Sequence, residues 1–394
     1  MIPTRPVWAE ISRSRLTANW KLLRAAAPVE AELVAVIKAD AYGHGAAACA
    51  PVLAAAGAEW FGVTCVEEAV ALRQVSSDSR ILVMSGLWCG EAEAVIEHRL
   101  SPQVWEPLHF DLLEEAARTL NSPPQSVRVQ LEIDSGMSRQ GVRSFVQLKE
   151  LLARITPDSP IQIEGVMTHF SAPEILQPDE TAQQLERFAA ALDLIAECGI
   201  HPRWIHAGNS TTLLAQHHTP ALLQLAKRHN ARLMLRPGIA LYGYPVPVTP
   251  QEASPSHAAQ KLTPVLAWKT RIVSVRTIEP GETAGYNMTF KARRPTRLDL
   301  IPVGYADGLN RLLSNRGHAL VRGQRALIAG RVSMDQTILD VTDISGVEIG
   351  DEVVLIGEQG QEKITATDLA DLTGTISYEV LCAIGARVPR VMID

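Results

Sequence analysis

The stretch Ala35-Val36-Ile37-Lys38 places a lysine where a short apolar run ends and a glycine-rich segment begins. The run from Leu33 to Ile37 has the pattern of a strand that is buried on both faces. A lysine at the end of such a strand either reaches solvent or takes part in chemistry, because an unpaired buried ammonium is costly. The chemical use that fits best is condensation with a carbonyl group, since desolvation lowers the pKa of an amine and makes it nucleophilic.

The elements around this lysine alternate between strand and helix patterns. Eight β-α alternations in about 240 residues predict a (β/α)8 barrel of the TIM type, a fold of roughly 250 residues. Helical spacing is found, for example, over 181–198 and 211–226. The predicted strands are Leu33 to Lys38, Trp60 to Val66, Ile81 to Met84, Pro102 to Trp105, Val127 to Asp134, Ile161 to His169, Arg203 to His206, and Arg232 to Leu235.

Polar residues gather where these strands end, which is the end of a barrel that carries function. The segments are Lys38, Asp134 to Arg139, Thr168-His169, Ala207 to Ser210, and Arg236 to Ile239. Loops after the seventh and eighth strands are the usual phosphate position, and small residues there let backbone N–H groups approach an anion. A lysine on the first strand facing such loops is the layout that pyridoxal phosphate (PLP) requires.

A proline-rich segment divides the chain into two predicted domains. The barrel is expected over 1–245 and a linker over 246–264, with the opening strand in 1–11 available to pack on the second domain. From 265 to 394 the pattern is mainly β, beginning with a predicted strand over 265–278. Short helices are expected near 368–372 and 378–383, where a threonine can cap the first. The predicted fold is thus α/β plus β.

Composition narrows the possible partners. The net charge of -6 offers no global attraction for nucleic acid or anionic membranes. The five cysteines are scattered and form no C-x-x-C pair, so we expect neither disulfides nor a metal site. No run is long and apolar enough for a membrane span or a signal peptide, which predicts a cytoplasmic protein.

The segment from Ala35 to Gly45 resembles the PLP-attachment motif of bacterial alanine racemases. Four further segments are similar to motifs of the same family and follow its order along the predicted β domain. They are Pro280 to Tyr286, Val303 to Gly308, Val332 to Gln336, and Ser377 to Val380. Each alone is compatible with a turn or a packing segment, but their joint order favours the resemblance.

The resemblance implies a role for each matched residue. It makes Lys38 and Tyr286 the two catalytic bases and PLP the cofactor. Cofactor-binding residues are then Lys38, Tyr42, His169, Asn209, Ser210, Arg236, Gly238, Ile239 and Tyr378; substrate-binding residues are Arg139, Met334 and Asp335; and Tyr305 narrows the entrance. Other readings stay open for three positions: a loop tyrosine at 42, a structural histidine at 169, and a plain helix N-cap at 209–210.

Two positions carry further chemical information. In the family, the arginine matched by Arg236 faces the pyridine nitrogen, and a guanidinium keeps its proton at ordinary pH. That nitrogen would then stay unprotonated, which disfavours transamination. Several family members carry a carbamylated lysine where this chain has Glu132, whose carboxylate could hold Arg139 without modification. The alternative is that Glu132 pairs with another base such as Arg128.

The resemblance implies an isomerase that interconverts L- and D-alanine, serving peptidoglycan synthesis (D-alanine biosynthesis) or alanine catabolism. It also implies a homodimer with shared sites, in which Tyr286 comes from the neighbouring subunit. A racemase of broader range, acting for example on serine, remains an alternative, because one hydroxyl changes discrimination by only about 1–3 kcal/mol. Residues 265–394 disfavour a non-catalytic PLP-binding barrel protein. Arg236 disfavours a PLP decarboxylase.

Overall fold

The protein is described here by a computed structural model that covers residues 4–176, 179–250 and 257–394. The chain divides into two compact units. We call residues 16–39 and 46–263 the barrel unit, and residues 1–15, 40–45 and 264–394 the β unit. Of the predicted linker, residues 251–256 lie outside the described residues, and the short helix α11 (His257–Lys261) follows them.

The barrel unit contains a closed barrel of eight parallel strands, as predicted. Each strand pairs in parallel with the next one along the chain, and β9 returns to β2. Apolar runs such as Leu33 to Val36 are fully buried, since one face fills the barrel and the other packs under helices. The strands are β2 (Glu32–Val36), β3 (Trp60–Val63), β4 (Arg80–Val83), β5 (Ser101–Val104), β6 (Val127–Glu132), β7 (Ile161–Met167), β8 (Trp204–His206) and β9 (Arg232–Leu235).

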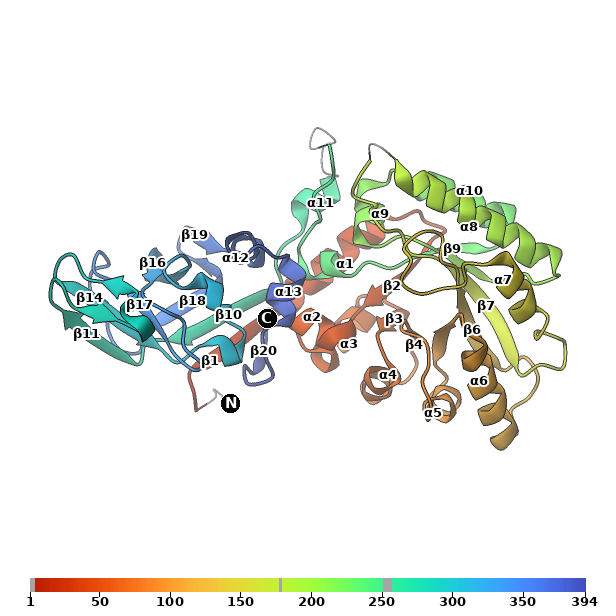
Figure 1. Cartoon of the computed structure of the whole chain (residues 1–394), viewed down its shortest axis with the longest axis horizontal. Helices are drawn as coiled ribbons and strands as arrows, with labels where there is room; N and C mark the ends of the chain where they lie inside the picture. The colour runs from red at the N-terminus through yellow and green to blue at the C-terminus, as the bar shows by residue number, and fades with distance from the viewer. Residues whose placement is uncertain (1–3, 177–178, 251–256) are drawn as a thin grey trace. The chain divides into compact units, whose positions relative to one another are not determined.

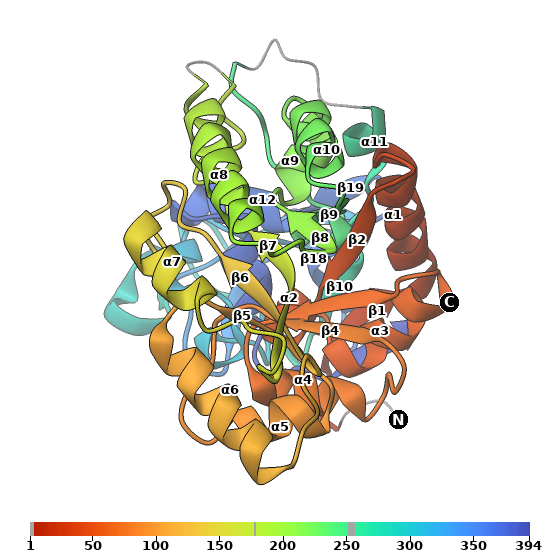
Figure 2. The ribbon, with the colours of Figure 1, turned by 90° about the vertical axis from the view of Figure 1, so that its right-hand side faces the viewer.

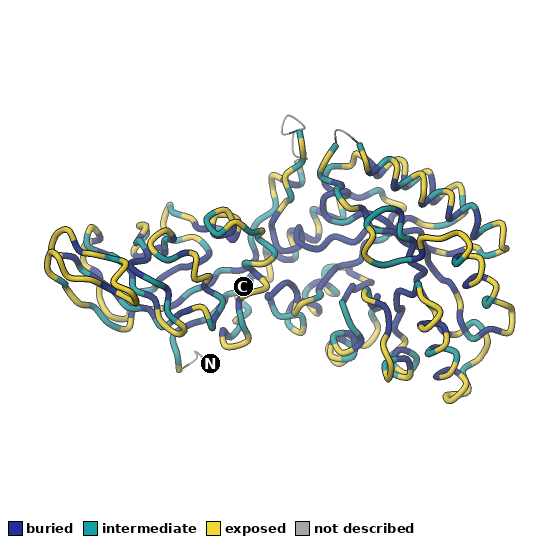
Figure 3. Tube along the Cα trace, in the orientation of Figure 1, coloured by how far each residue is buried: buried dark blue, intermediate teal, exposed yellow. Residues whose placement is uncertain are grey.

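Helices surround these strands (Figure 2), and exposed residues lie along their outer sides (Figure 3). In α6, for example, Phe110 and Leu113 are buried at helical spacing, and Pro107 occupies the first turn, where its missing N–H costs nothing. Among the described residues, no helix is long and apolar enough to cross a bilayer. The helices are α1 (Arg13–Ala26), α3 (Ala46–Ala55), α4 (Val66–Arg73), α5 (Ala92–Glu97), α6 (Pro107–Thr119), α7 (Phe145–Leu152), α8 (Glu180–Glu197), α9 (Ser210–Ala215) and α10 (Thr219–Arg228).

Closure of the barrel brings the lysine strand beside the last strand. Leu33 of β2 is in register with Leu235 of β9, and the N–H of Val36 donates to the carbonyl of Pro237 at 3.0 Å. The hydroxyl of Tyr242, in the 3-10 helix η1 (Ile239–Tyr242), donates to the carbonyl of Val36 at 3.1 Å. The segment that precedes Lys38 is therefore a direct neighbour of the segment that follows β9, rather than lying across the barrel from it.

One predicted helix is wrong. The pattern over 211–226 predicted a continuous helix, but α9 ends at Ala215 and α10 begins at Thr219. Gln216 adopts a left-handed conformation with φ 58°, which ends the first helix, and Pro220 in the first turn of α10 suits a new helix start. The turn between the two helices holds His217 and His218.

The β unit is built on a ten-stranded sheet (Figure 1). The predicted strand over 265–278 is two strands, because the chain leaves the first at Arg271 and enters another part of the sheet at Ser274. In sheet order the strands are β11 (Ser274–Ile278), β14 (Thr296–Ile301), β17 (Thr337–Asp340), β16 (Gln324–Ile328), β15 (His318–Val321), β18 (Glu352–Gln359), β10 (Leu266–Arg271), β1 (Val7–Ser12) and β20 (Arg390–Ile393), with β19 (Glu362–Ile364) paired to β18.

The opening strand belongs to this sheet. β1 pairs antiparallel with β10 and parallel with β20, so that Ala9 is opposite both Trp268 and Arg390. The remaining elements of the β unit are short, and Thr365 caps α12 as its sequence predicted. They are β12 (Thr283–Ala284), η2 (Tyr286–Met288), β13 (Phe290–Lys291), η3 (Tyr305–Asp307), η4 (Arg311–Leu313), α12 (Ala366–Thr373) and α13 (Ser377–Cys382).

Candidate active site

Lys38 stands at the start of an unusual turn. It follows Ile37 after β2 and opens α2 (Lys38–Gly43), in which Ala39 to Gly43 all have positive φ values. A left-handed turn of non-glycine residues costs roughly 1–2 kcal/mol per residue, and such strain concentrates at functional sites. Glu68 of α4 helps to hold the entry into the turn, because its carboxylate accepts from the N–H groups of Ala39 (2.8 Å) and Thr64 (2.7 Å).

Arg236 is a buried cation at the end of β9, with 5% of its surface exposed. Its guanidinium donates to the carbonyl of Thr168 at 2.9 Å and lies 3.0 Å from Nδ1 of His206. Burial lowers the pKa of Arg236 to about 10, and the negative charge of Glu132 opposes that change. The guanidinium therefore keeps its charge at neutral pH, as the sequence predicted.

His169, at the end of β7, lies beside this arginine. Its Nδ1 is 3.4 Å from Nη2 of Arg236. Burial lowers the pKa of His169 to about 3, with further lowering by the charges of Arg236, Arg139 and Lys38. The imidazole is thus neutral at physiological pH, and these three charged residues act on it together.

The loops after β8 and β9 are joined through one hydroxyl. Oγ of Ser210 accepts from the N–H groups of Gly238 (2.9 Å) and Ala240 (3.2 Å). Asn209 caps α9, because its side chain accepts from two N–H groups of the first turn. Gly208 has φ +87°, and a Cβ there would lie 2.8 Å from the side chain of Thr212. The absence of a side chain at this position leaves the loop backbone open to an anionic group.

Glu132 is held by a different residue from the one expected. Its carboxylate is buried and accepts from Nε2 of Gln140 at 2.7 Å. Within the described ranges, no ion pair joins Glu132 to Arg139 or Arg128, although Arg139 is one of the charges that lower its pKa. Burial is the larger effect and raises the pKa of Glu132 to about 7. The carboxyl group is therefore close to half-ionised at neutral pH.

Tyr42 and Tyr378 meet in the β unit. Their ring centroids are 5.9 Å apart, and Tyr42 is 7% exposed. Burial raises the pKa of Tyr42, and Tyr378 and Cys382 raise it further. Gly43 follows with φ +79°, and a Cβ there would overlap the carbonyl oxygen of Leu381 in α13. Only glycine allows α13 to approach this turn so closely, and that approach brings the two tyrosines together.

Gly304 allows two segments of the β unit, Val303 to Gly308 and Val332 to Gln336, to lie close together. A Cβ at Gly304 would overlap the carbonyl oxygens of Ser333 and Met334. The close approach lets Tyr305 donate its N–H to the carbonyl of Ser333 at 3.0 Å. Tyr305 and Met334 therefore lie on adjoining turns, and their side chains are 43% and 53% exposed.

Asp335 is oriented by an arginine that sequence analysis did not single out. Nη2 of Arg387 donates to its carboxylate at 2.8 Å, and Nε of Arg387 lies 3.4 Å from the buried carboxylate of Asp307. Tyr286 opens η2 directly after Gly285 and is 69% exposed. Its side chain is thus accessible to another molecule.

Models of two protein-family domains match the chain: alanine racemase, N-terminal domain, over residues 11–246, and alanine racemase, C-terminal domain, over residues 265–392. The chain belongs to the alanine racemase family. An alanine racemase of Symbiobacterium thermophilum is 40% identical over 388 residues, which cover 98% of this chain and 97% of that protein. The chain is therefore an isomerase with alanine racemase activity.

Solved alanine racemases are similar over nearly the full length. The enzyme of Streptomyces coelicolor superposes with a TM-score of 0.87 at 33% identity, over 99% of this chain and 98% of that one. The enzyme of Bacillus anthracis, solved with bound L-Ala-P, has a TM-score of 0.87 at 29% identity, over 100% and 96% of the two chains. The barrel and the mainly β domain are thus those of alanine racemases.

The family motifs did not reveal the residues that hold the matched ones in place. His206 contacts Arg236, and Gln140 contacts Glu132. Arg387 contacts Asp335. The sequence could have indicated His206 as a site residue, because it is the last residue of a predicted strand and lies at the functional end of the barrel. Gln140 and Arg387 had none, since loop geometry alone brings them to their carboxylates.

Proposed function

We propose that this racemase interconverts L- and D-alanine with PLP as cofactor, using Lys38 and Tyr286 as bases on opposite faces of the substrate Cα. The cluster of Lys38, His169 and Arg236 at the barrel end carries the proposal. It combines an amine that can bind an aldehyde with a buried cation suited to a ring nitrogen. A planar carbanion can be protonated on either face, so racemisation needs a base on each side.

The residues present fit PLP by their chemistry. Lys38 supplies the amine, Arg236 a permanent donor, and the loops around Gly208 and Gly238 an open backbone for a phosphate. Asn209, Ser210 and Ile239 belong to the same loops, while Tyr42 and Tyr378 offer phenolic hydroxyls from the β unit. PLP, when bound, withdraws electrons from the substrate Cα and so acidifies its proton.

The protein residues move the proton and fix the substrate. When Nζ of Lys38 takes the Cα proton from one enantiomer, Oη of Tyr286 would give a proton to the opposite face. In the reverse direction Oη of Tyr286 would take the proton and Nζ of Lys38 would give one. Arg139 offers its guanidinium to the substrate carboxylate, with Met334 and Asp335 bordering that group. Tyr305 restricts the entrance to small side chains. Arg236 would stay protonated throughout and would offer a positive charge to the ring nitrogen.

The two bases are assigned to different subunits of a homodimer. Tyr286 of the partner subunit would complete the site that contains Lys38, so that a dimer has two composite sites. The high exposure of Tyr286 supports this arrangement, because an exposed phenol is available to another chain. The product would serve peptidoglycan synthesis or alanine catabolism in the cytoplasm.

Reduction of the PLP-loaded protein with borohydride tests the assignment of Lys38. The reduced cofactor should be recovered on the peptide that contains Lys38, and the Lys38→Ala variant should lose both the label and racemisation. Lys227→Ala, which removes an exposed lysine paired with Glu30, is the control and should behave as wild type. A label on another lysine, or wild-type turnover by Lys38→Ala, would contradict the proposal.

A further inference from the structure

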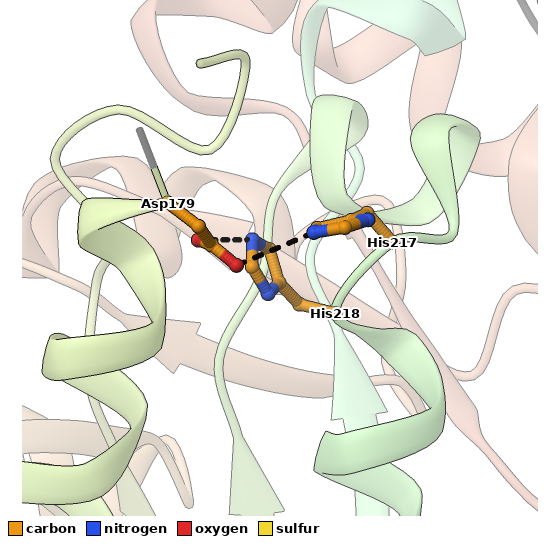
Figure 4. Close-up of side chains that lie close together, drawn as sticks. All are labelled: Asp179, His217 and His218. Carbon is orange, nitrogen blue, oxygen red and sulfur yellow. Dashed lines mark hydrogen bonds and ion pairs between the residues drawn. The ribbon is translucent and has the colours of Figure 1, made fainter. Parts of the chain in front are cut away.

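Two histidines and one aspartate meet in the barrel unit (Figure 4). Asp179 is the N-cap of α8, whereas His217 and His218 form the turn between α9 and α10. Within the described residues, this is the only group of three or more histidine, cysteine or acidic side chains close enough to share a metal ion. None of the three residues has a role in the reaction proposed above.

The distances within the cluster are those of a coordination sphere. Nε2 of His217 lies 3.3 Å from Oδ2 of Asp179, and Nε2 of His218 lies 3.3 Å from Oδ1. One ligand atom from each residue lies within 4.8 Å of the other two. Zinc bonds of about 2.0–2.1 Å in a tetrahedron place neighbouring ligands about 3.3 Å apart. Each of the two measured separations equals that edge in length, although the two end on different oxygens of the Asp179 carboxylate.

The buried Nε2 atom of His218 is a second, independent observation that points to a bound ion. The His218 side chain is 6% exposed, and its Nε2 is aimed at the carboxylate but has no hydrogen-bond partner among the described residues. A buried nitrogen without a hydrogen-bond partner is uncommon, and a metal ion would satisfy it.

A second histidine–aspartate pair in the barrel unit differs from this cluster in the ion pairs that its aspartate makes. Nε2 of His229 also lies 3.3 Å from Asp193, but Arg228 occupies that carboxylate at 2.7 Å. In the described part of the chain, no lysine or arginine forms an ion pair with Asp179. Oδ1 of Asp179 accepts a hydrogen bond from the N–H of Ala182, and Oδ2 is within hydrogen-bond distance of Nε2 of His217; the remaining lone pairs of the carboxylate are available to a cation.

We propose that Asp179, His217 and His218 form a binding site for Zn²⁺ or a similar borderline cation. Two imidazoles and one carboxylate favour zinc over magnesium or calcium, which take oxygen ligands. Because His217 is 45% exposed and Asp179 is 31% exposed, water can complete the coordination. The ion would join the start of α8 to the α9–α10 turn. The site is separate from racemisation, although His218 packs near Phe170, the residue after His169 (ring centroids 6.0 Å).

Zinc titration of the PLP-loaded enzyme, in competition with a chromophoric chelator, tests the site. Wild type should bind one Zn²⁺ per chain at micromolar concentrations, and its melting temperature should rise with Zn²⁺ but not with Mg²⁺. Asp179→Asn keeps an effective N-cap for α8 while it removes the anionic ligand. This variant and His217→Asn should each weaken zinc binding by about tenfold or more.

The control variant is His229→Asn, which removes a buried histidine from the other pair and should bind zinc as wild type does. Circular dichroism and racemisation without added metal should be the same for Asp179→Asn, His217→Asn and wild type, which shows that the variants fold. Co²⁺ in place of zinc should give visible absorption bands that disappear in both variants. Failure of wild type to bind zinc, or equal affinity in Asp179→Asn and wild type, would overturn the proposal.

Discussion

Nη1 of Arg236 lies 3.0 Å from Nδ1 of His206, and both groups are buried inside the barrel. Because a guanidinium has no acceptor, Nδ1 of His206 must accept, and its proton must be on Nε2. That nitrogen is 3.1 Å from Oε1 of Gln130, whose amide lies 3.3 Å from Glu164. Glu164 in turn pairs with Arg80 at 2.6 Å. The orientation of Arg236 thus depends on a row of hydrogen-bonded side chains that continues into the barrel interior.

His206→Leu should destabilise the protein and impair catalysis together. The change leaves donors of Arg236 without a partner in a buried site, at a cost of about 1–3 kcal/mol per unsatisfied group. Urea unfolding measures the loss, and turnover with saturating alanine measures the effect on kcat. His206→Gln retains an acceptor and should recover part of the kcat. Equal kcat in the Leu and Gln variants would show that His206 acts through packing alone.

Arg236→Glu should slow racemisation and increase transamination. A carboxylate near the ring nitrogen would favour its protonation, which strengthens PLP as an electron acceptor and lengthens the life of the carbanion. We expect racemisation to fall by about a hundredfold, with more pyruvate formed per alanine racemised. Arg236→Lys keeps the positive charge and is the control. An unchanged ratio of pyruvate to racemised alanine in Arg236→Glu would place the arginine away from that nitrogen.

Glu132 should make stability depend on pH. Its pKa is about 7 in the folded protein against an ordinary glutamate value of 4.5, so the folded state holds the proton more tightly. The resulting stabilisation of about 3 kcal/mol is present below pH 4.5 and is lost as the pH rises to about 7. Glu132→Gln cannot ionise and should therefore gain stability over wild type at pH 8 relative to pH 5.

Urea unfolding of wild type and Glu132→Gln at the two pH values measures this difference. Glu150→Gln, at an exposed position of α7, is the control and should change the unfolding free energy little at either pH. A difference between wild type and Glu132→Gln that does not vary from pH 5 to pH 8 would refute the perturbed carboxyl group.

The barrel could be predicted because its strands depend on local sequence. Apolar runs such as Leu33 to Ile37 have little alternative to a buried strand, and strand order then places Lys38 and Arg236 at one end. The α9–α10 break escaped prediction because helical periodicity continues through it, whereas Gln216 ends α9 by a backbone conformation that its side chain does not signal.

Other features depend on contacts that no local pattern encodes. The left-handed turn from Ala39 to Gly43 uses residue types that avoid this conformation, and only the surrounding structure can impose it. The pairing of Glu132 with Gln140, instead of Arg139, depends on the path of the loop after β6. Cysteine spacing gives no sign of a metal site, and helical periodicity over 211–226 places His217 and His218 within one predicted helix.

Combining two inactive variants should restore activity if the site is shared between subunits. Lys38→Ala and Tyr286→Phe should each be severely impaired as homodimers, because every site lacks one base. In the mixed dimer, one site has both bases and the other has neither. Turnover per mixed dimer should then reach about half that of wild type, since the two bases act as one unit. No recovery after co-expression would indicate that both bases come from one chain.

The parallel pairing of β1 with β20 has a consequence for biosynthesis. Ala9 is opposite Arg390, so a strand that leaves the ribosome early acquires this neighbour only after nearly the whole chain has been translated. The strands of the barrel lie within residues 32–235 and can assemble while synthesis continues, because domains generally fold as units. Long-range pairing is slow for entropic reasons, which makes closure of the β1–β20 edge a late event in folding. Until then one edge of β1 remains unpaired, even where β10 already covers the other edge.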